Sequence, residues 1–175
     1  MLKLAAALAA GLWLAAGPVA AHGPSRLKTD QGVTLDATPD EVWAVVGDFA
    51  DMSWFPGVAS VAATGAEKGA TRVVTMADGQ SVTEELTKLD PARRAISVRV
   101  TEDNVAAIPA TQYASHIVVG DDAGKARLEW KGAFYRAFPL NDPPPAQNDD
   151  AAIAAITALH QTGIDALVAR FGIVQ

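Results

Sequence analysis

The sequence contains no cysteine among its 175 residues. This absence excludes a disulfide framework, a thiol nucleophile, thiolate metal sites, covalent c-type haem and a lipid-modified cysteine anchor. The sequence also lacks a glycine-rich phosphate loop and a Gly-x-Ser-x-Gly nucleophile motif. No motif therefore indicates catalysis, and the folded part of the chain must be held together by its hydrophobic core alone.

Positive charge is scarce. The chain has 14 Lys and Arg residues against 20 Asp and Glu residues, which gives a formal net charge of −6. An acidic protein repels nucleic-acid phosphates and anionic lipids. The balance argues against nucleic-acid binding and membrane-surface roles, and it leaves a basic partner or an uncharged ligand open.

The N-terminus has the organisation of a secretory signal peptide. Lys3 precedes the uncharged run Leu4–Ala16, and Gly17-Pro18-Val19-Ala20-Ala21 supplies a helix breaker and small residues for cleavage after Ala21. The run is shorter than the roughly 20 apolar residues of a membrane span. We predict that residues 1–21 are removed, that 22–175 form one periplasmic domain without stable membrane insertion, and that losing Lys3 shifts the net charge to −7.

The three histidines, His22, His116 and His160, show no zinc or iron spacing, and a structural or surface role is expected for each. His22 has an alternative: as the first residue after cleavage, its amino group and imidazole could chelate Cu(II) together. A mature terminus often begins with a polar residue for no chemical reason. No metal site and no cofactor is therefore predicted.

Hydrophobic periodicity predicts a strand, two short helices, six strands and one long helix. Val33, Leu35 and Ala37 alternate with polar residues in a strand over 28–37, and Thr38-Pro39-Asp40-Glu41 forms a capping box that opens a helix. Asp51 is expected to start a second short helix, which ends at Pro56-Gly57. The remaining strands are predicted at Val58–Thr64, Ala70–Met76, Gln80–Leu89, Ala95–Thr101, Gln112–Val119 and Lys125–Arg136.

The chain becomes helical from about Asn148 to Gly172, where apolar residues recur every three or four positions and form one stripe. The stripe comprises Ile153, Ile156, Leu159, His160, Gly163, Ile164, Leu167, Val168 and Phe171. Gly163 is unfavourable by about 1 kcal/mol relative to Ala in a helix, so it indicates close backbone approach or room for a ligand. An α+β fold follows, in which a curved antiparallel sheet of about seven strands grips this helix.

Several segments carry a resemblance to a known family. Thr38-Pro39-Asp40-Glu41-Val42-Trp43, Asp48-Phe49, Trp54-Phe55-Pro56-Gly57-Val58, Gly69-Ala70-Thr71-Arg72 and Glu84-Glu85-Leu86 resemble the START-like polyketide-cyclase superfamily (SRPBCC, helix-grip fold). His22, Tyr113, the run Trp130–Arg136 and Asn148-Asp149-Asp150-Ala151 resemble the periplasmic MxaD-type accessory proteins of bacterial methanol oxidation. The resemblance implies a non-catalytic factor that assists a methanol dehydrogenase and its cytochrome c acceptor.

Glu84 is the most informative titratable residue, because it shares a strand face with Val82 and Leu86. If this face is inward, Glu84 lies in the cavity as a ligand anchor or a general acid–base. The resemblance agrees, since some superfamily members have a pocket Glu in a Glu-x-Leu motif. The alternatives are a solvated rim position or a structural pair with Arg72 or Arg99.

The candidate ligand-binding residues are Trp54, Glu84, Tyr113, Trp130 and Phe134. Trp130 and Phe134 share a strand face with Leu128 and Gly132, and core packing is the alternative role for both aromatic residues. The candidate partner-binding residues are Asp142, Asp149 and Asp150, which flank a stiff Pro-rich segment, although helix capping also accounts for the last two.

Three functions remain open at this point. The first is the accessory role in methanol oxidation, in which the acidic surface binds a basic partner. The second is binding or transport of a small hydrophobic ligand between helix and sheet. The third is a cyclase-like enzyme that uses Glu84.

Overall fold

A computed structural model describes residues 23–174, so the predicted signal peptide and His22 lie outside the described residues. The elements in chain order are β1 (Leu27–Leu35), α1 (Pro39–Val46), β2 (Val58–Ala63), β3 (Thr71–Met76), β4 (Ser81–Asp90), β5 (Ala95–Glu102), β6 (Ala110–Asp122), β7 (Lys125–Arg136) and α2 (Asp149–Phe171). Short 3-10 turns occupy Pro91–Arg93 and Pro145–Gln147. The predicted number and order of strands are confirmed.

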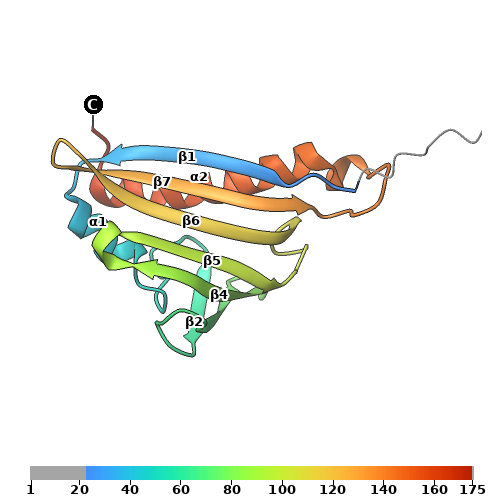
Figure 1. The fold of residues 1–175 in the computed structure, drawn as a ribbon, viewed down its shortest axis with the longest axis horizontal. Helices are drawn as coiled ribbons and strands as arrows, with labels where there is room; N and C mark the ends of the chain where they lie inside the picture. The colour runs from blue at the N-terminus through green and yellow to red at the C-terminus, as the bar shows by residue number, and fades with distance from the viewer. Residues whose placement is uncertain (1–22, 175) are drawn as a thin grey trace, which may run out of the picture.

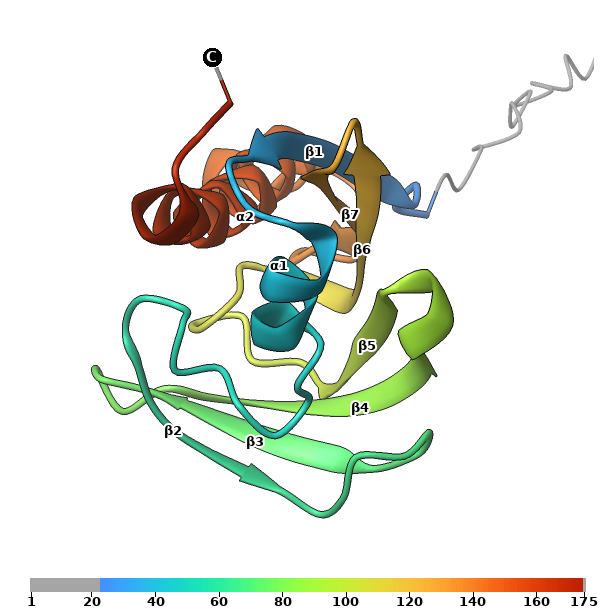
Figure 2. The same cartoon turned by 90° about the vertical axis from the view of Figure 1, so that its left-hand side faces the viewer.

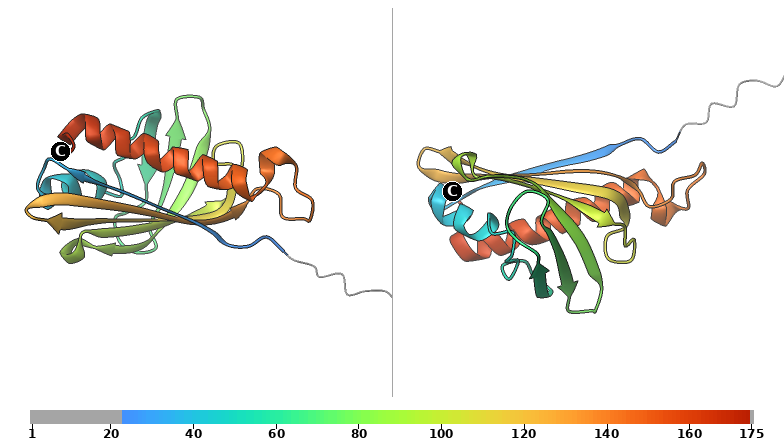
Figure 3. Two further views of the ribbon diagram at one scale, coloured as in Figure 1. Left: turned by 90° about the horizontal axis from the view of Figure 1, so that it is seen from above. Right: turned by 60° about the horizontal axis from the view of Figure 1, so that its bottom comes forward.

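All seven strands form one antiparallel sheet in the order β1-β7-β6-β5-β4-β3-β2 (Figure 1). The sheet is strongly curved: Figure 2 shows β4, β3 and β2 curling beneath α1, while β1, β7 and β6 stand beside α2. Helix α2 runs lengthwise over the sheet (Figure 3) and packs mainly on β1 and β7. This arrangement is the predicted helix-grip fold.

Helix α1 begins as its capping box predicts. The Thr38 hydroxyl accepts a hydrogen bond from the Glu41 amide (3.3 Å), and the Glu41 carboxylate accepts one from the Thr38 amide (2.8 Å). Val42 and Val46 of this helix are buried against the sheet. The short helix therefore fills one end of the concave face and leaves the centre free.

The second short helix that was expected after Asp51 is not formed. The Asp48 and Asp51 carboxylates instead accept hydrogen bonds from the amides two residues later, those of Ala50 (2.9 Å) and Ser53 (2.7 Å). Such side-chain turns compete with helical hydrogen bonding. The segment between α1 and β2 is therefore a series of turns, and it forms a loop over the concave face.

Helix α2 turns most of the predicted stripe toward the sheet, with Leu159, Val168 and Phe171 half-buried. Ile156, His160, Gly163, Ile164 and Leu167 are buried, whereas Ile153 is 36% exposed. Its place against the sheet is taken by the smaller Ala152, which is fully buried. The first turn of α2 therefore faces the sheet with a different side than its spacing suggests.

The interior contains two hydrophobic clusters. The larger cluster joins α1, the sheet and the second half of α2, and its fully buried members include Leu35, Val42, Leu86 and Leu128. The smaller cluster lies near the start of α2 and comprises Ala110, Tyr113, Phe134, Ala152 and Ile156. The candidate site lies where these two clusters meet.

Candidate functional site

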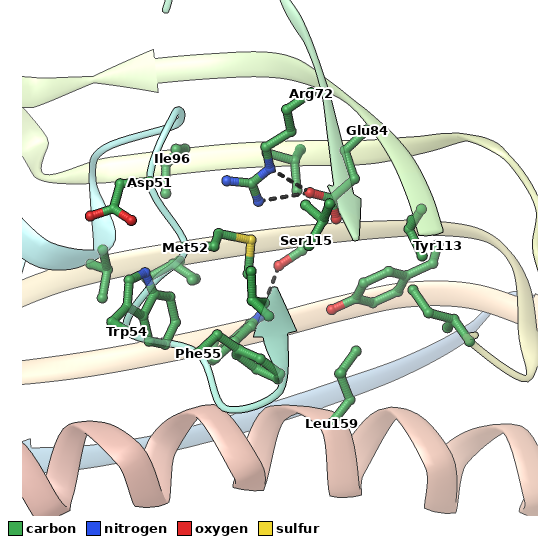
Figure 4. A pocket seen from close by; sticks show the side chains of 18 of the residues that line it. Asp51, Met52, Trp54, Phe55, Arg72, Glu84, Ile96, Tyr113, Ser115 and Leu159 are labelled. Atoms are coloured by element: carbon green, nitrogen blue, oxygen red, sulfur yellow. Dashed lines mark hydrogen bonds and ion pairs between the residues drawn. The ribbon is translucent and has the colours of Figure 1, made fainter. Parts of the chain in front are cut away.

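The concave face of the sheet encloses a cavity of about 120 Å³. The turns between α1 and β2 and Leu159 of α2 complete its walls (Figure 4). Exposed Asp51 and half-buried Trp54 mark the side where it meets solvent. Its apolar lining comprises Val46, Met52, Trp54, Phe55, Val58, Val74, Met76, Val82, Ile96, Val98, Ala107, Ile108, Ile117, Trp130 and Leu159.

A buried ion pair projects into this apolar space from neighbouring strands. Arg72 on β3 and Glu84 on β4 are directly paired in the sheet, and both point inward. The Arg72 Nε and Nη2 atoms each lie 2.7 Å from Glu84 Oε2, and Arg72 Nη1 donates to the Phe49 carbonyl at 2.9 Å. These charge-assisted bonds allow the two charges to be buried.

The other carboxylate oxygen of Glu84, Oε1, forms no hydrogen bond with any residue in the described range 23–174. Since Glu84 lines the cavity, this oxygen is an acceptor for a ligand. Neighbouring Glu85 faces the opposite side of the sheet, where it pairs with Arg99 at 2.8 Å. Glu84 therefore both lines the cavity and forms a structural pair with Arg72, two roles that the sequence had offered as alternatives.

Trp130 and Ser115 form a second polar contact at the cavity wall. The Trp130 indole Nε1–H donates to the Ser115 hydroxyl at 2.8 Å, and both side chains are buried. The Trp130 ring also contacts the rings of Trp54 and Phe55, with centroid separations of 6.0 and 6.4 Å. The aromatic rings therefore form one continuous wall.

The third polar contact joins β6 to α2. The Tyr113 hydroxyl lies 2.7 Å from Nε2 of His160, and the imidazole stacks on Trp130 with centroids 4.7 Å apart. His160 is fully buried, and its other nitrogen, Nδ1, has no hydrogen-bond partner among residues 23–174. Such an unpaired buried atom is uncommon in folded proteins.

Burial controls the protonation of this pair. Loss of solvation lowers the pKa of His160 to about 4, so the imidazole is neutral at pH 7. Burial also raises the pKa of Tyr113 above its usual range, although the nearby Ser115 hydroxyl opposes this effect. The cavity is therefore lined by the neutral phenol of Tyr113, which the neutral imidazole of His160 contacts from behind, and by the ion pair of Arg72 and Glu84.

Four of the five candidate ligand-binding residues line the cavity: Trp54, Glu84, Tyr113 and Trp130. Phe134 does not line it and is a correction to the predicted set. Its side chain is fully buried in the smaller cluster, where its ring lies 6.4 Å from that of Tyr113. Phe134 points inward as predicted, but the strand carries it past the cavity into packed core.

The candidate partner-binding acids differ in exposure. Asp142 and Asp150 are exposed, whereas Asp149 is half-buried and pairs with Arg136 at 3.2 Å. Asn148 caps α2 by accepting from the Ala151 amide at 2.8 Å. Two of the three acids are therefore available to a partner, and the third also holds the start of α2.

The buried polar residues of the site that were not selected from the sequence are Arg72 and Ser115, which line the cavity, and His160, the partner of Tyr113. His160 was included in the apolar stripe of the helix, and a polar residue within such a stripe is the signal that could have identified it. His116, by contrast, is half-buried and lies 2.7 Å from the Ser97 hydroxyl. Within 23–174, no group of His, Asp and Glu residues is arranged to hold a metal ion.

The chain is similar to several solved structures. An uncharacterised protein from Bacillus thuringiensis is 23% identical (84% of this chain, 98% of that chain, TM-score 0.66). The protein XoxI from Bacillus cereus is 24% identical (82% and 94%, TM-score 0.68), and the ZhuI aromatase/cyclase from Streptomyces sp. R1128 is 20% identical (83% and 93%, TM-score 0.66). At this identity the likeness establishes the fold alone.

A search among curated proteins finds no match. A family model described as polyketide cyclase/dehydrase and lipid transport, however, matches residues 26–172, which include every helix and strand of the described residues. This match agrees with the superfamily expected from the sequence. The chain therefore belongs to the polyketide cyclase/dehydrase and lipid transport family.

Proposed function

We propose that this protein binds a small, mainly apolar molecule in the cavity between sheet and helix, without catalysing its conversion. The observation that carries the proposal is a cavity of about 120 Å³ with a mainly apolar lining and one carboxylate oxygen free to accept a hydrogen bond. A cavity of about 150 Å³ in another protein binds benzene, so a cavity of about 120 Å³ is in the size range of one small ring.

The geometry of Glu84 supports a binding role. Its Oε2 lies 2.7 Å from both Nε and Nη2 of Arg72, and these contacts hold the carboxylate in one orientation. A carboxylate fixed in this way can orient a bound ligand through its other oxygen.

Ethylbenzene is a suitable probe because it is a small single-ring compound without a polar group. We expect it to perturb the NMR amide signals of the lining residues, and the substitution Val98→Phe, which fills the cavity, should abolish binding. The matched control is Val73→Phe, since Val73 is 38% exposed and does not line the cavity. Equal binding to Val98→Phe and to the unmodified protein would contradict the proposal.

A second candidate function is that of a periplasmic accessory protein, which assists a methanol dehydrogenase and its cytochrome c. It is supported by the resemblance of Tyr113, the Trp130–Arg136 segment and the start of α2 to the MxaD-type proteins, and by the exposed acids Asp142 and Asp150. Such acids would steer a basic partner, and this attraction weakens as salt shortens the Debye length from about 10 Å at 0.1 M to about 3 Å at 1 M.

The test is a reconstituted dehydrogenase–cytochrome assay with the chain from His22 onward. Electron transfer should increase, the increase should fall with salt, and Asp142→Asn with Asp150→Asn should reduce it. Asp149 is left unchanged because it pairs with Arg136. Absence of any increase at every ionic strength would reject the accessory role, and an increase insensitive to salt and to both substitutions would reject its electrostatic basis.

A further inference from the structure

Two hydroxyl groups reach the cavity from alternate residues of β6. Tyr113 and Ser115 share the inward face of the strand and are 4% and 8% exposed, and both line the cavity (Figure 4). Each hydroxyl is in contact with a ring nitrogen from a neighbouring element. These nitrogens determine which hydrogen-bonding capacity remains for a ligand.

Ser115 is the simpler case. The indole nitrogen of Trp130 can only donate, so the Ser115 oxygen must be the acceptor of this bond. Among residues 23–174, the acceptor beside the Ser115 proton is the neighbouring Tyr113 hydroxyl, which also lines the cavity. The Ser115 proton can therefore turn from Tyr113 to a ligand oxygen in the cavity.

Tyr113 follows the same pattern if the proton of neutral His160 is on Nε2. With the proton on Nδ1, a buried N–H group would lack any acceptor, because Nδ1 has no partner among the described residues. Buried N–H groups without partners are rarer than buried acceptors without partners. The Nε2–H form is therefore favoured, and its proton is donated to the Tyr113 oxygen, which leaves the phenolic proton free.

We propose that Tyr113 and Ser115 together form a two-hydroxyl site that donates hydrogen bonds to the carbonyl oxygen of a neutral, ring-sized carbonyl compound. This inference rests on the proposed binding function and names the ligand class. A carbonyl oxygen accepts two hydrogen bonds and has no proton that would compete with the hydroxyls. The ligand is neutral because Arg72, the cation that lines the cavity, is already paired with Glu84, so the cavity offers no free positive charge to an anionic oxygen.

The tautomer of His160 can be tested without any ligand. The ¹⁵N chemical shifts of its two ring nitrogens, measured at pH 7 through their couplings to the carbon-bound ring protons, should show the proton on Nε2. A proton on Nδ1 would direct the Tyr113 proton to His160 and would overturn the assignment of Tyr113 as a donor to the cavity.

The ligand class is tested with acetophenone and ethylbenzene, which have similar sizes and differ in the carbonyl oxygen. Ethylbenzene is the more hydrophobic of the two compounds, so their absolute affinities are not directly comparable. The measured quantity is therefore the ratio of their dissociation constants, compared between variants. Tyr113→Phe and Ser115→Ala should each weaken acetophenone about fivefold relative to ethylbenzene, the size expected for one lost hydrogen bond. Bound acetophenone should also show a lowered infrared carbonyl stretch that returns toward its value in apolar solvent in each variant.

Phe134→Leu is the matched control, since Phe134 contacts Tyr113 but does not line the cavity. It should leave the ratio unchanged, and an equal change in this variant would overturn the site. If the ratio of the two dissociation constants is the same in all variants, and Val98→Phe still prevents ethylbenzene from binding, the carbonyl site is overturned but the proposed binding function is not. Failure of both probes to bind the unmodified protein would overturn this inference and the proposed function together. If Tyr113→Phe does not fold, Ser115→Ala decides the outcome.

Discussion

The cavity is bordered by two buried polar pairs that are built differently. Arg72 and Glu84 are charged, lie on adjacent strands, and are held by bonds from both Nε and Nη2 of the guanidinium and by a further bond to the Phe49 carbonyl. Tyr113 and His160 are neutral, come from a strand and a helix, and share one hydrogen bond, while Nδ1 of His160 has no partner among the described residues.

The difference shows what burial requires of charged and neutral groups. An unpaired buried charge is far more unfavourable than an unpaired neutral atom, so the ion pair must be satisfied within the protein. In the neutral pair, Nδ1 of His160 can remain without a hydrogen bond at a lower cost, and the Tyr113 hydroxyl can form a further hydrogen bond with a ligand. The ion pair of Arg72 and Glu84 is therefore bonded mainly within the protein, whereas the Tyr113 hydroxyl can still form a hydrogen bond with a ligand.

The charged pair should show the largest response to substitution. Arg72→Met leaves Glu84 as an unpaired buried carboxylate, and breaking a buried ion pair in this way destabilises proteins by about 3–5 kcal/mol. The free energy of unfolding from urea denaturation measures the loss. Adding Glu84→Leu should recover most of it, because the uncompensated charge is then removed. A loss below about 1 kcal/mol in the single variant would show that the pair is not effectively buried.

The neutral pair should respond to pH instead. The pKa of His160 is about 4 in the folded protein and has its ordinary value of 6.5 in the unfolded chain, so between these values the unfolded chain binds more protons. Stability should therefore fall as the pH decreases from about 6.5 to 4, by at most about 3 kcal/mol from this residue.

Urea denaturation between pH 7.5 and 4.5 measures this dependence. His160→Phe, which retains an aromatic ring beside Trp130, should have a shallower slope than the unmodified protein. His116→Gln is the control, because His116 is only half-buried although burial also lowers its pKa. Identical slopes for the unmodified protein and His160→Phe would refute the linkage.

The neutral wall also depends on close packing at Gly163. A Cβ atom at this position would lie 2.5 Å from Trp130 Cζ3 and 3.0 Å from Phe55 Cε2. Overpacking of this kind is unfavourable by about 1–3 kcal/mol, whereas the gain in helix propensity is about 1 kcal/mol. Gly163→Ala should thus destabilise the protein by about 1 kcal/mol in urea denaturation, and Thr162→Ala on the exposed side of the same turn should not. Stabilisation by Gly163→Ala would mean that Trp130 moves aside freely.

The fold could be predicted because its signals are local. The Thr38 capping box, the alternation in the strands and the apolar stripe of α2 each depend on a few neighbouring residues. The second short helix was wrong for an equally local reason, since Asp48 and Asp51 accept hydrogen bonds from amides two residues later and thereby form turns. The sequence pattern alone did not distinguish a turn aspartate from a helix cap.

The site could be predicted only in part, because its partners are far apart in the chain. Alternation placed Glu84 on the inward face, and Arg72 was one of two possible partners until strand register selected it over Arg99. Tyr113 and His160 are 47 positions apart and meet only through the packing of α2 on the sheet. Phe134 was predicted wrongly for a different reason. Alternation correctly placed its side chain on the inward face, but it could not show that this position on β7 lies beyond the cavity.

The smallest loss of stability is expected for a second Arg–Glu pair, which lies on the outer face of the sheet. Glu85 follows Glu84 along β4 and pairs with Arg99 at 2.8 Å, but the Arg99 side chain is 58% exposed. Exposed ion pairs contribute about 0–1 kcal/mol and are screened by salt. Arg99→Met should therefore lower the free energy of unfolding by less than about 1 kcal/mol, and the loss should disappear at 1 M salt. Because both pairs join Arg to Glu across adjacent antiparallel strands, a loss for Arg99→Met as large as that for Arg72→Met would show that strand pairing, and not burial beside the cavity, determines the strength of the inner pair.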